Sequence, residues 1–522
     1  MLTDRFHQLR RDELDDVFSK SNISKIWRKV VRQQLRNVDI LDIYDYYDFN
    51  YNIDSRAILL RNDILSGNYV SSKPLIYRVE KKLGICRHLT IPQPTDALIL
   101  QIITDKITPE ILSNQPSENS YYSRDRHYLK KPHEIDEYGF NWRELWKKMQ
   151  KKIFKFSEQK DLIIVTDLSN YYDSIYIPEL RKIITGYVNN NEALLDILFG
   201  IIERISWLPD YLPYTGRGLP TSNLEGIRLL AHSFLFEFDE IIKKRSNDSF
   251  TRWMDDVVIA VDNRKEAVNV LSSSSDVLKS RGLALNLKKT NIYTAKEAEF
   301  HFLIDENKYL DSIDFDYHLQ KGIKSISNEL MKKFRSHLKT NQNSKSFEKI
   351  TKRYITSFGK LYSKRILKDI PNLYNENPGI RQNLLFYLSI LGYNKRTAEV
   401  VLKIFDELKL HDDISLFNIC KLITEWNIPL TQEGDEFVQK SEKKIRTFSM
   451  SRKQIFDFYC LLWVKTKYSH PEDLFKFIFD YKGIWNSHPF LRRQVTSIMG
   501  RLYLYKEDKV RSFLDNQIST AE

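Results

Sequence analysis

Two adjacent carboxylates interrupt an apolar run in the segment RWMDDVVIAV, residues 252–261. Asp255 and Asp256 follow a tryptophan and a methionine, and the five residues after them are all apolar. β-Branched residues such as these favour strands. Two negative charges side by side on a strand repel each other and lose hydration when buried. The pair therefore predicts either a solvated β-turn or a site at which another charge offsets the repulsion.

A third carboxylate stands upstream, at the end of another strand-like run. Residues 162–165 read as a buried strand, and Asp167 lies near its end, where a side chain can face a cleft. This strand, beside a hairpin that carries Asp255 and Asp256, can gather three carboxylates around one point. Two divalent ions would then neutralise the repulsion, and such a two-metal clamp suits phosphoryl transfer. The flanking strands thus favour a metal site over a solvated turn.

Length and charge narrow the class of protein. A chain of 522 residues exceeds what one core serves, so the sequence predicts two or more domains. A net charge of +12 favours a polyanionic partner. The three cysteines are far apart, so we expect a reducing compartment and no disulfide framework. The charged N-terminus and the lack of about 18 consecutive uncharged apolar residues indicate no signal peptide and no membrane span.

The pattern of apolar and polar residues changes along the chain, and the sequence predicts three regions. Residues 1–60 form a helical N-terminal extension, residues 61–320 mix strands with helices, and residues 321–522 are helical.

Two C-terminal segments resemble each other: NPGIRQNLLFYLSILG from residue 377 and HPFLRRQVTSIMGRLY from residue 488. Each has a proline near the first helical turn, Pro378 or Pro489, then Arg, Gln and an apolar face. Their spacing leaves room for three helical pairs of about 37 residues, near the period of HEAT-like repeats. Chance similarity between two amphipathic helices is the alternative.

Six segments in chain order complete the pattern around the carboxylates. They are KKLGICRHLTIPQPTDALILQ (from residue 81), DLSNYYDSI (167), GRGLPTSN (216), WMDD (253), GLALNLKKT (282) and EFHFLI (299). In this order they resemble the fingers signature and palm motifs A to E of reverse transcriptases. The resemblance covers roughly residues 60–305. It implies an α+β fold: a right-hand fingers and palm domain, followed by an all-α, HEAT-like domain in place of a thumb.

The resemblance assigns roles to the carboxylates and their neighbours. Asp167 and Asp255 would bind two Mg²⁺ ions, which Mn²⁺ could replace, with help from Asp256 and the backbone carbonyl of Leu168. Lys289 would protonate or stabilise the leaving pyrophosphate. An ordinary surface lysine is the alternative for Lys289.

The resemblance also implies a site for a dNTP. Lys82 and Arg87 would grip the triphosphate, which an arginine can do with a bidentate fork. Tyr172, five positions after Asp167, would lie under the sugar as a steric gate favouring deoxynucleotides. The alternatives are a solvated hairpin for the two basic residues and a packed core aromatic for Tyr172.

Motif B departs from the family pattern. Leu219, Pro220 and Thr221 would contact the nucleotide, but the family usually has Gln and Gly after Leu-Pro, where this chain has Thr221 and Ser222. That glutamine helps to hold nucleotide and template, so the departure bears on template handling. Motif C begins with Trp253 in place of the usual Tyr or Phe, and no basic thumb is evident.

A palm followed by a helical region of this length resembles the abortive-infection (Abi) reverse transcriptases of bacteria and prophages. The group's helical N-terminus is similar to residues 21–50. The resemblance implies an enzyme of the bacterial cytoplasm that arrests phage growth, forms a homo-oligomer and makes single-stranded DNA from dNTPs without a template. That DNA would be attached to a tyrosine of the protein itself.

A tyrosine hydroxyl can replace a primer 3′-hydroxyl as the nucleophile. The sequence does not say which of its 29 tyrosines does so. Clusters contain Tyr44, Tyr46, Tyr47, Tyr51, Tyr121 and Tyr122. Two rival functions stay open: a templated reverse transcriptase that copies a dedicated RNA, and a catalytically silent nucleic-acid-binding scaffold. The three aspartates argue against the scaffold, which has no need of clustered carboxylates near a polyanion.

Overall fold

The chain divides into two compact units, each described here by itself. The computed structural model describes residues 2–122, 142–189, 192–209, 211–222, 224–318, 323–342, 344, 346–452 and 455–502. Unit 1 consists of Met1–Leu41, Tyr46–Ile76 and His88–His301, and unit 2 of Asp42–Asp45, Tyr77–Arg87 and Phe302–Glu522. Two short N-terminal segments therefore belong to the second unit.

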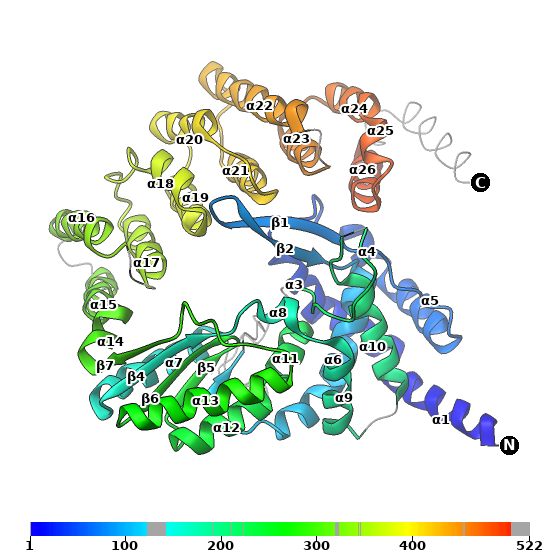
Figure 1. Cartoon of the computed structure of the whole chain (residues 1–522). Helices are drawn as coiled ribbons and strands as arrows, with labels where there is room; N and C mark the ends of the chain where they lie inside the picture. Colours follow the sequence, from blue (N-terminus) through cyan, green and yellow to red (C-terminus); the bar gives the residue numbers. More distant parts are fainter. Residues whose placement is uncertain are drawn as a thin grey trace. The chain divides into compact units, whose positions relative to one another are not determined.

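A five-stranded sheet forms the centre of unit 1 (Figure 1). Its strands are β3 (Ser120–Tyr121), β4 (Leu162–Asp167), β5 (Phe250–Trp253), β6 (Asp256–Val261) and β7 (Asn291–Thr294). Their order is β3-β5-β6-β4-β7, with β3 parallel to β5 and the other pairs antiparallel. The apolar runs of β4 and β6 are buried, as expected for central strands. Three helices pack on the sheet: α7 (Trp142–Gln159), α12 (Phe236–Ser246) and α13 (Arg264–Ser280).

Helices make up most of the rest of unit 1. They are α1 (Leu2–Val17), α2 (Lys20–Ile26), the π-helical η1 (Trp27–Val31), α3 (Arg32–Arg36), α4 (Tyr47–Tyr51), α5 (Ile53–Leu65), α6 (Pro94–Ser113), α7 (Trp142–Gln159), α8 (Tyr171–Ser174), α9 (Ile177–Tyr187), α10 (Glu192–Ile205), α11 (Glu225–Ser233), α12 (Phe236–Ser246), α13 (Arg264–Ser280) and α14 (Ala295–Phe302). Helix α6 is largely buried against α2, α10 and α11. The segment that resembles motif E lies at the end of α14 and the start of the next helix.

Strands β1 (Leu75–Lys82) and β2 (Ile85–Ile91) form the hairpin predicted around Gly84. Leu83 and Gly84 both have positive φ angles, 55° and 76°. Two-residue hairpin turns need such angles because their twist matches that of the strands. The division between the units passes through this hairpin, whose tip belongs to unit 2.

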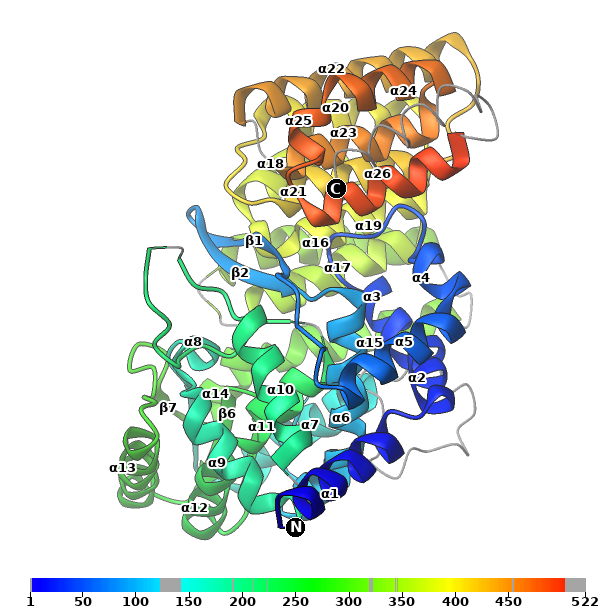
Figure 2. The same cartoon turned by 90° about the vertical axis from the view of Figure 1, so that its right-hand side faces the viewer.

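Unit 2 is built from stacked helices (Figures 1 and 2). They are α15 (Ile304–His318), α16 (Ile323–Thr340), α17 (Phe347–Lys360), α18 (Ile370–Glu376), the 3₁₀ turn η2 (Pro378–Ile380), α19 (Arg381–Leu391), α20 (Lys395–Glu407), α21 (Ile414–Glu425), α22 (Gln432–Arg452), α23 (Ile455–Tyr468), α24 (Pro471–Asp480), α25 (Lys482–Trp485) and α26 (Pro489–Leu502). Helices α17, α19, α21 and α23 contact in succession, as do α18, α20 and α22. Two such rows are typical of helical repeats.

The predicted fold class is therefore confirmed: an α+β domain with a mixed sheet precedes an all-helical C-terminal region. The predicted domain limits at residues 60 and 320 stay predictions, and the second falls outside the described residues. Within the part of the chain that the structure describes, no helix has the length and hydropathy needed to cross a membrane.

The two similar C-terminal segments begin at η2 and at α26, and both tie an N-terminal segment into unit 2. Arg381 Nη1 lies 2.8 Å from Oε2 of Glu80 on the hairpin tip. Arg493 Nη1 lies 2.7 Å from Oδ2 of Asp42. The arginines that follow each proline thus bind acidic residues from the start of the chain.

Candidate active site

Strand β4 carries Asp167 at its last position, in the middle of the sheet. The residue is 5% exposed, and its register partner on β6 is Asp256. Carboxylates directly opposite each other on paired strands repel. Lys289 supplies a compensating charge, because its Nζ lies 2.6 Å from Oδ2 of Asp167, and Asn286 Nδ2 donates to the same oxygen at 3.4 Å. The structure thus places an ammonium group against the carboxylate of Asp167.

A two-residue turn of Met254 and Asp255 joins β5 to β6. Met254 has a φ of 54°, a conformation that hairpin turns require and that side chains disfavour. Two backbone bonds hold the turn: Met254 N donates to Tyr121 O at 3.1 Å, and Leu168 N donates to Asp255 O at 3.3 Å. Asp255 and Asp256 are both half-buried. The pair does lie at a β-turn, but at one bonded to the strand end that carries the third aspartate.

Residues that resemble motif D run beside the chain that leaves β4. Leu168 and Leu285 form an antiparallel bridge, and Asn286 N donates to Asp167 O at 2.7 Å. A turn after Asn286 then brings Lys289 back to the carboxylate of Asp167. The structure therefore brings together Asp167, Leu168 and Lys289, which the sequence predicts for one site.

A buried ion pair lies beneath the Met254–Asp255 turn. Arg252 and Asp239 are both 0% exposed, and Arg252 Nε donates to Asp239 Oδ1 at 2.6 Å. Arg252 Nη1 donates to the carbonyl of Met254 at 2.9 Å, and its Nη2 lies 3.3 Å from Nδ1 of His232. Burial raises the pKa of Asp239, and the guanidinium of Arg252 partly offsets this. The ion pair thus positions the turn from inside the sheet.

The motif B loop is bonded to the end of motif A. Leu219 N donates to the carbonyl of Tyr172 at 2.9 Å, and Thr90 N donates to the carbonyl of Thr221 at 2.9 Å. Leu219 and Pro220 are buried, whereas Tyr172 and Thr221 are half-buried. These predicted nucleotide-binding residues therefore share one part of unit 1. The last residue of the predicted motif, at position 223, lies outside the described residues.

Lys82 and Arg87 lie on the tip of the β1–β2 hairpin, and both are exposed. Lys82 is the last residue of β1 and Arg87 the third of β2. The tip belongs to unit 2, whereas the three aspartates belong to unit 1. The hairpin's role in binding a triphosphate therefore stays a prediction.

Buried charges hold this hairpin tip within unit 2. Arg78 Nη2 lies 2.9 Å from Oδ1 of Asp413, whose backbone N donates to Arg78 O at 3.0 Å. Glu80 accepts from Arg381, and its own N donates to Oδ2 of Asp412 at 3.3 Å. Apart from Arg78, these residues are at most 7% exposed. Burial is the main cause that raises the pKa of Asp412.

Comparison with known families identifies the fingers and palm. Residues 79–304 match the family model described as reverse transcriptase (RNA-dependent DNA polymerase). These residues therefore have a reverse-transcriptase-like fold. The match contains all three aspartates, Lys289 and the motif B loop. The chain matches no curated protein.

Solved structures of telomerases are similar to the chain. One is telomerase from Candida albicans in complex with a TWJ fragment of telomeric RNA, at 10% identity and a TM-score of 0.32, with 76% of this chain and 64% of that chain covered. Another is apo telomerase from Candida tropicalis, at 10% identity and a TM-score of 0.33, with 78% and 68% covered. The chain therefore spans about 64% of the length of the Candida albicans telomerase chain.

Reverse-transcriptase domains generally use divalent ions such as Mg²⁺. In the described ranges, no group of three or more His, Cys, Asp or Glu side chains is arranged to hold a metal ion. The donor chemistry of the site nevertheless fits Mg²⁺, because carboxylates and a backbone carbonyl are the hard oxygen ligands that this ion prefers. Asp167, Asp255 and Asp256, with the carbonyl of Leu168, are the residues that would hold it.

Sequence reasoning missed the supports of the reverse-transcriptase domain. Strand β3 has only two residues, and Arg252 was not singled out. One signal was available: Arg252 directly precedes Trp253 and Met254 in a strand-like run, and a charge in a buried strand requires a partner. The partner itself, Asp239, could not be chosen from among many acidic residues.

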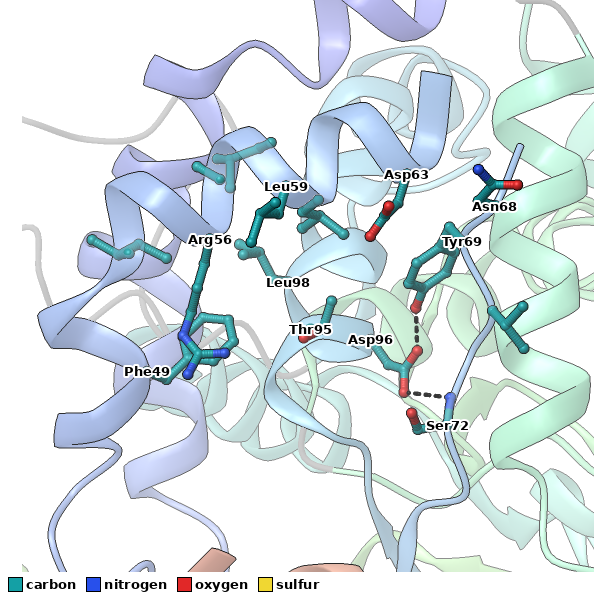
Figure 3. A pocket seen from close by; sticks show the side chains of 15 residues that line it. Phe49, Arg56, Leu59, Asp63, Asn68, Tyr69, Ser72, Thr95, Asp96 and Leu98 are labelled. Carbon is teal, nitrogen blue, oxygen red and sulfur yellow. Dashed lines mark hydrogen bonds between the residues drawn. The ribbon is translucent and has the colours of Figure 1, made fainter. Parts of the chain in front are cut away.

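A cavity of about 410 Å³ lies elsewhere in unit 1, between α5 and the start of α6 (Figure 3). Asp96 is buried at its wall, where Tyr69 donates its hydroxyl proton to the carboxylate and Ser72 N donates at 3.2 Å. Burial is the first cause that raises the pKa of Asp96 and of Tyr69. None of the residues predicted for the active site lines this cavity.

Proposed function

We propose that the chain is a DNA polymerase of reverse-transcriptase type that transfers nucleotides at Asp167, Asp255 and Asp256. The observation that carries the proposal is the pairing of β4 with β6, which sets Asp167 opposite Asp256 and bonds the Asp255 turn to Leu168. The match of residues 79–304 to the family model supports the same reaction.

Each side chain has a defined task in this proposal. A hydroxyl oxygen loses its proton to solvent and attacks the α-phosphorus of a dNTP, a new P–O bond forms, and the bond to the pyrophosphate oxygen breaks. Bound divalent ions would supply charge stabilisation to both oxygens. Asp167 and Asp255 would hold the ions, with Asp256 assisting. Lys289 donates a proton or charge to the pyrophosphate, and Tyr172 excludes a 2′-hydroxyl.

We further propose that synthesis is untemplated and primed by a tyrosine of the protein, in phage defence by abortive infection. Thr221 and Ser222 stand where template-copying relatives usually have Gln and Gly, and stacked helices follow the palm where a thumb is usual. A hydroxyl on the enzyme removes the need to capture a separate primer, which suits a modest net charge of +12. A homo-oligomer in the bacterial cytoplasm belongs to the same proposal.

A priming tyrosine must be accessible. Of the tyrosines singled out from the sequence, Tyr47 and Tyr51 are 60% and 71% exposed, whereas Tyr46, Tyr121 and Tyr122 are at most 5% exposed. The buried hydroxyls cannot reach a dNTP without local unfolding. Exposure therefore supports Tyr47 or Tyr51 over the buried candidates.

The decisive experiment offers the purified chain one labelled dNTP at a time with Mg²⁺, without template or primer. On a denaturing gel, the label should migrate with protein and should enter as free DNA only after protease treatment. Asp255→Asn is the matched control, because it removes a charge with little change in volume and should abolish incorporation. A folded Asp255→Asn chain that incorporates at the wild-type rate refutes the metal assignment.

The family description as an RNA-dependent DNA polymerase favours one alternative, a templated reverse transcriptase. Label that appears only when an RNA template is supplied, and that runs as free DNA without protease, would establish it. Binding of nucleic acid with no incorporation under either condition would instead establish a catalytically silent scaffold.

A further inference from the structure

The loop between α10 and α11 carries several exposed aromatic side chains; the two helices that it joins are labelled in Figure 2. Trp207 is 42% exposed, Tyr211 85% and Tyr214 42%, and Tyr176, at the start of α9, is 40% exposed. We call these four side chains the aromatic rim. Large exposed apolar patches mark interaction sites more often than they mark ordinary surface.

Two of the rings are held in place although they face solvent. Trp207 stacks on His88 with ring centroids 4.0 Å apart and an interplanar angle of 8°. The Cζ atom of Arg217 lies over the ring of Tyr176, 5.6 Å from the ring centroid. The two residues also form a β-bridge. A side chain with a fixed ring loses little conformational entropy when a ligand stacks on it.

Gly216 is required for this arrangement. Its φ is +72°, and a Cβ placed there would lie 3.0 Å from Cε2 of Tyr176. Any other residue would be strained in its backbone and would press on the ring. The loop sequence therefore maintains an exposed tyrosine next to Arg217, an arrangement that adds little to the core.

The aromatic rim is continuous with the motif B loop. Ser206, next to Trp207, donates its hydroxyl proton to the carbonyl of Gly218 at 3.0 Å. The following residue, Leu219, is bonded to the carbonyl of Tyr172. Trp207, Tyr211 and Tyr214 thus lie on the same segment between α10 and α11 as Leu219, Pro220 and Thr221, and Tyr176 is joined to that segment by its β-bridge with Arg217.

We propose that the aromatic rim binds single-stranded nucleic acid by stacking its bases. Aromatic rings bind bases without regard to sequence, because every base has a π-face, and an arginine adds phosphate and cation–π contacts. The bonding to motif B and the match of this domain to a polymerase family favour nucleic acid over a protein partner. The proposal rests on the proposed function, but it concerns binding and not chemistry.

The test measures binding alone. Fluorescence anisotropy of a labelled oligodeoxythymidylate, without dNTP or Mg²⁺, should show Trp207→Ala and Tyr214→Ala binding about 5- to 150-fold more weakly than wild type. Trp207→Phe should retain most of the affinity, because it keeps a ring. Phe386→Ala, which removes a ring that is 56% exposed in unit 2, is the matched control and should bind as wild type.

Salt separates stacking from charge. Arg217→Gln should reduce the salt dependence of the affinity, whereas Trp207→Ala should leave its slope unchanged. Binding is measured without dNTP or Mg²⁺, so a failure of the polymerase proposal and a failure of this one remain distinct.

Two outcomes overturn the proposal. One is wild-type affinity in folded Trp207→Ala and Tyr214→Ala chains, as judged by circular dichroism. The other is that these variants bind the oligonucleotide as wild type does but differ from wild type in molecular mass by light scattering. That result would assign the rim to contacts between copies of the protein.

Discussion

The two units each contain a buried network of arginine and carboxylate groups, and the networks differ in reach and in balance. In unit 1, Arg252 pairs with one acid, Asp239, 13 positions away, and both are fully buried. In unit 2, Arg381 pairs with Glu80, 301 positions away, and Arg78 pairs with Asp413, 335 positions away. The first network is local and balanced, whereas the second joins distant segments and includes Asp412, whose pKa burial raises.

This difference separates two structural tasks. A balanced local pair fixes one geometry, here the carbonyl of Met254 in the turn that carries Asp255. A network with more acids than bases connects a hairpin to a helical repeat, and burial raises the pKa of one of its acids, Asp412. On the proposed function, the first network positions the chemistry, and the second positions the hairpin that carries Lys82 and Arg87.

Breaking the unit 1 pair should have the largest effect. Arg252→Met leaves Asp239 buried without its counter-charge, which costs about 3–5 kcal/mol of unfolding free energy. The carbonyl of Met254 also loses its donor, so kcat should fall with KM for dNTP little changed. Urea unfolding and single-dNTP kinetics measure the two effects.

Two controls accompany this variant. Arg252→Met with Asp239→Leu should recover much of the stability, because the lone charge is gone, but should not recover kcat. Arg181→Met removes a pair with Glu192 and Asp196 at the surface, where such pairs are worth about 0–1 kcal/mol. Equal losses from Arg252→Met and Arg181→Met would show that the buried pair does not matter.

Breaking the unit 2 network should cost less. Arg381→Met leaves Glu80 and Asp412 without their arginine, a loss of about 1–3 kcal/mol, because Glu80 still accepts from Gly84 N and Asp412 still accepts from Ser415 Oγ, each at 2.9 Å. If the hairpin grips the triphosphate, KM for dNTP should rise while kcat is retained. A fall in kcat with unchanged KM would reverse the assignment of tasks to the two networks.

The sequence predicts the sheet strands and the order of the motifs better than their supports. Residues 162–165 and 257–261 are short apolar runs rich in β-branched residues, and the two features together favour buried strands. The pairings of Arg252 with Asp239 and of Arg381 with Glu80 follow from packing in three dimensions. The spacing of residues along the chain does not indicate which of many charged side chains will form a pair. Strand β3 could not be predicted for a similar reason, because its two residues form a strand only by pairing with β5.

Only the part of the candidate site that lies in the sequence motifs could be predicted. Asp167, Asp255 and Lys289 stand in motifs of fixed order, so their proximity could be expected. The assignment of the hairpin tip to unit 2 could not, because it depends on Asp412 and Asp413, which stand more than 300 positions away.

Substitution of Tyr172, the proposed steric gate in unit 1, should have a smaller effect than either arginine substitution. Tyr172→Val should raise ribonucleotide incorporation relative to deoxynucleotide incorporation by about tenfold or more, equivalent to about 1.4 kcal/mol. The reason is steric, since a shorter side chain leaves room for a 2′-hydroxyl. Competition between rNTP and dNTP in single-turnover reactions measures it. Unchanged discrimination in a folded variant would return Tyr172 to a packing role.

Protonation of the unit 2 network should give the smallest effect, a change in the pH dependence of stability. Burial is the main cause that raises the pKa of Asp412, and Arg381 opposes it only in part. Between the ordinary carboxyl pKa and the raised one, the folded chain holds more protons than the unfolded chain. Stability therefore falls as pH rises through that window. Asp412→Asn cannot ionise, so its stability should fall less than that of wild type over the same range.

Urea unfolding of both chains at a series of pH values measures this difference. The buried acids Asp96 and Asp239, whose pKa values are also raised by burial, are present in both chains and cancel in the comparison. Ser415, which donates to Asp412, also stays in place, so a constant offset between the curves reports the changed hydrogen bond alone. Curves that stay parallel through the window would mean that Asp412 keeps its charge when folded. The network of unit 2 would then keep its charges as that of unit 1 does. The two networks would differ only in the sequence separation of the residues that they pair.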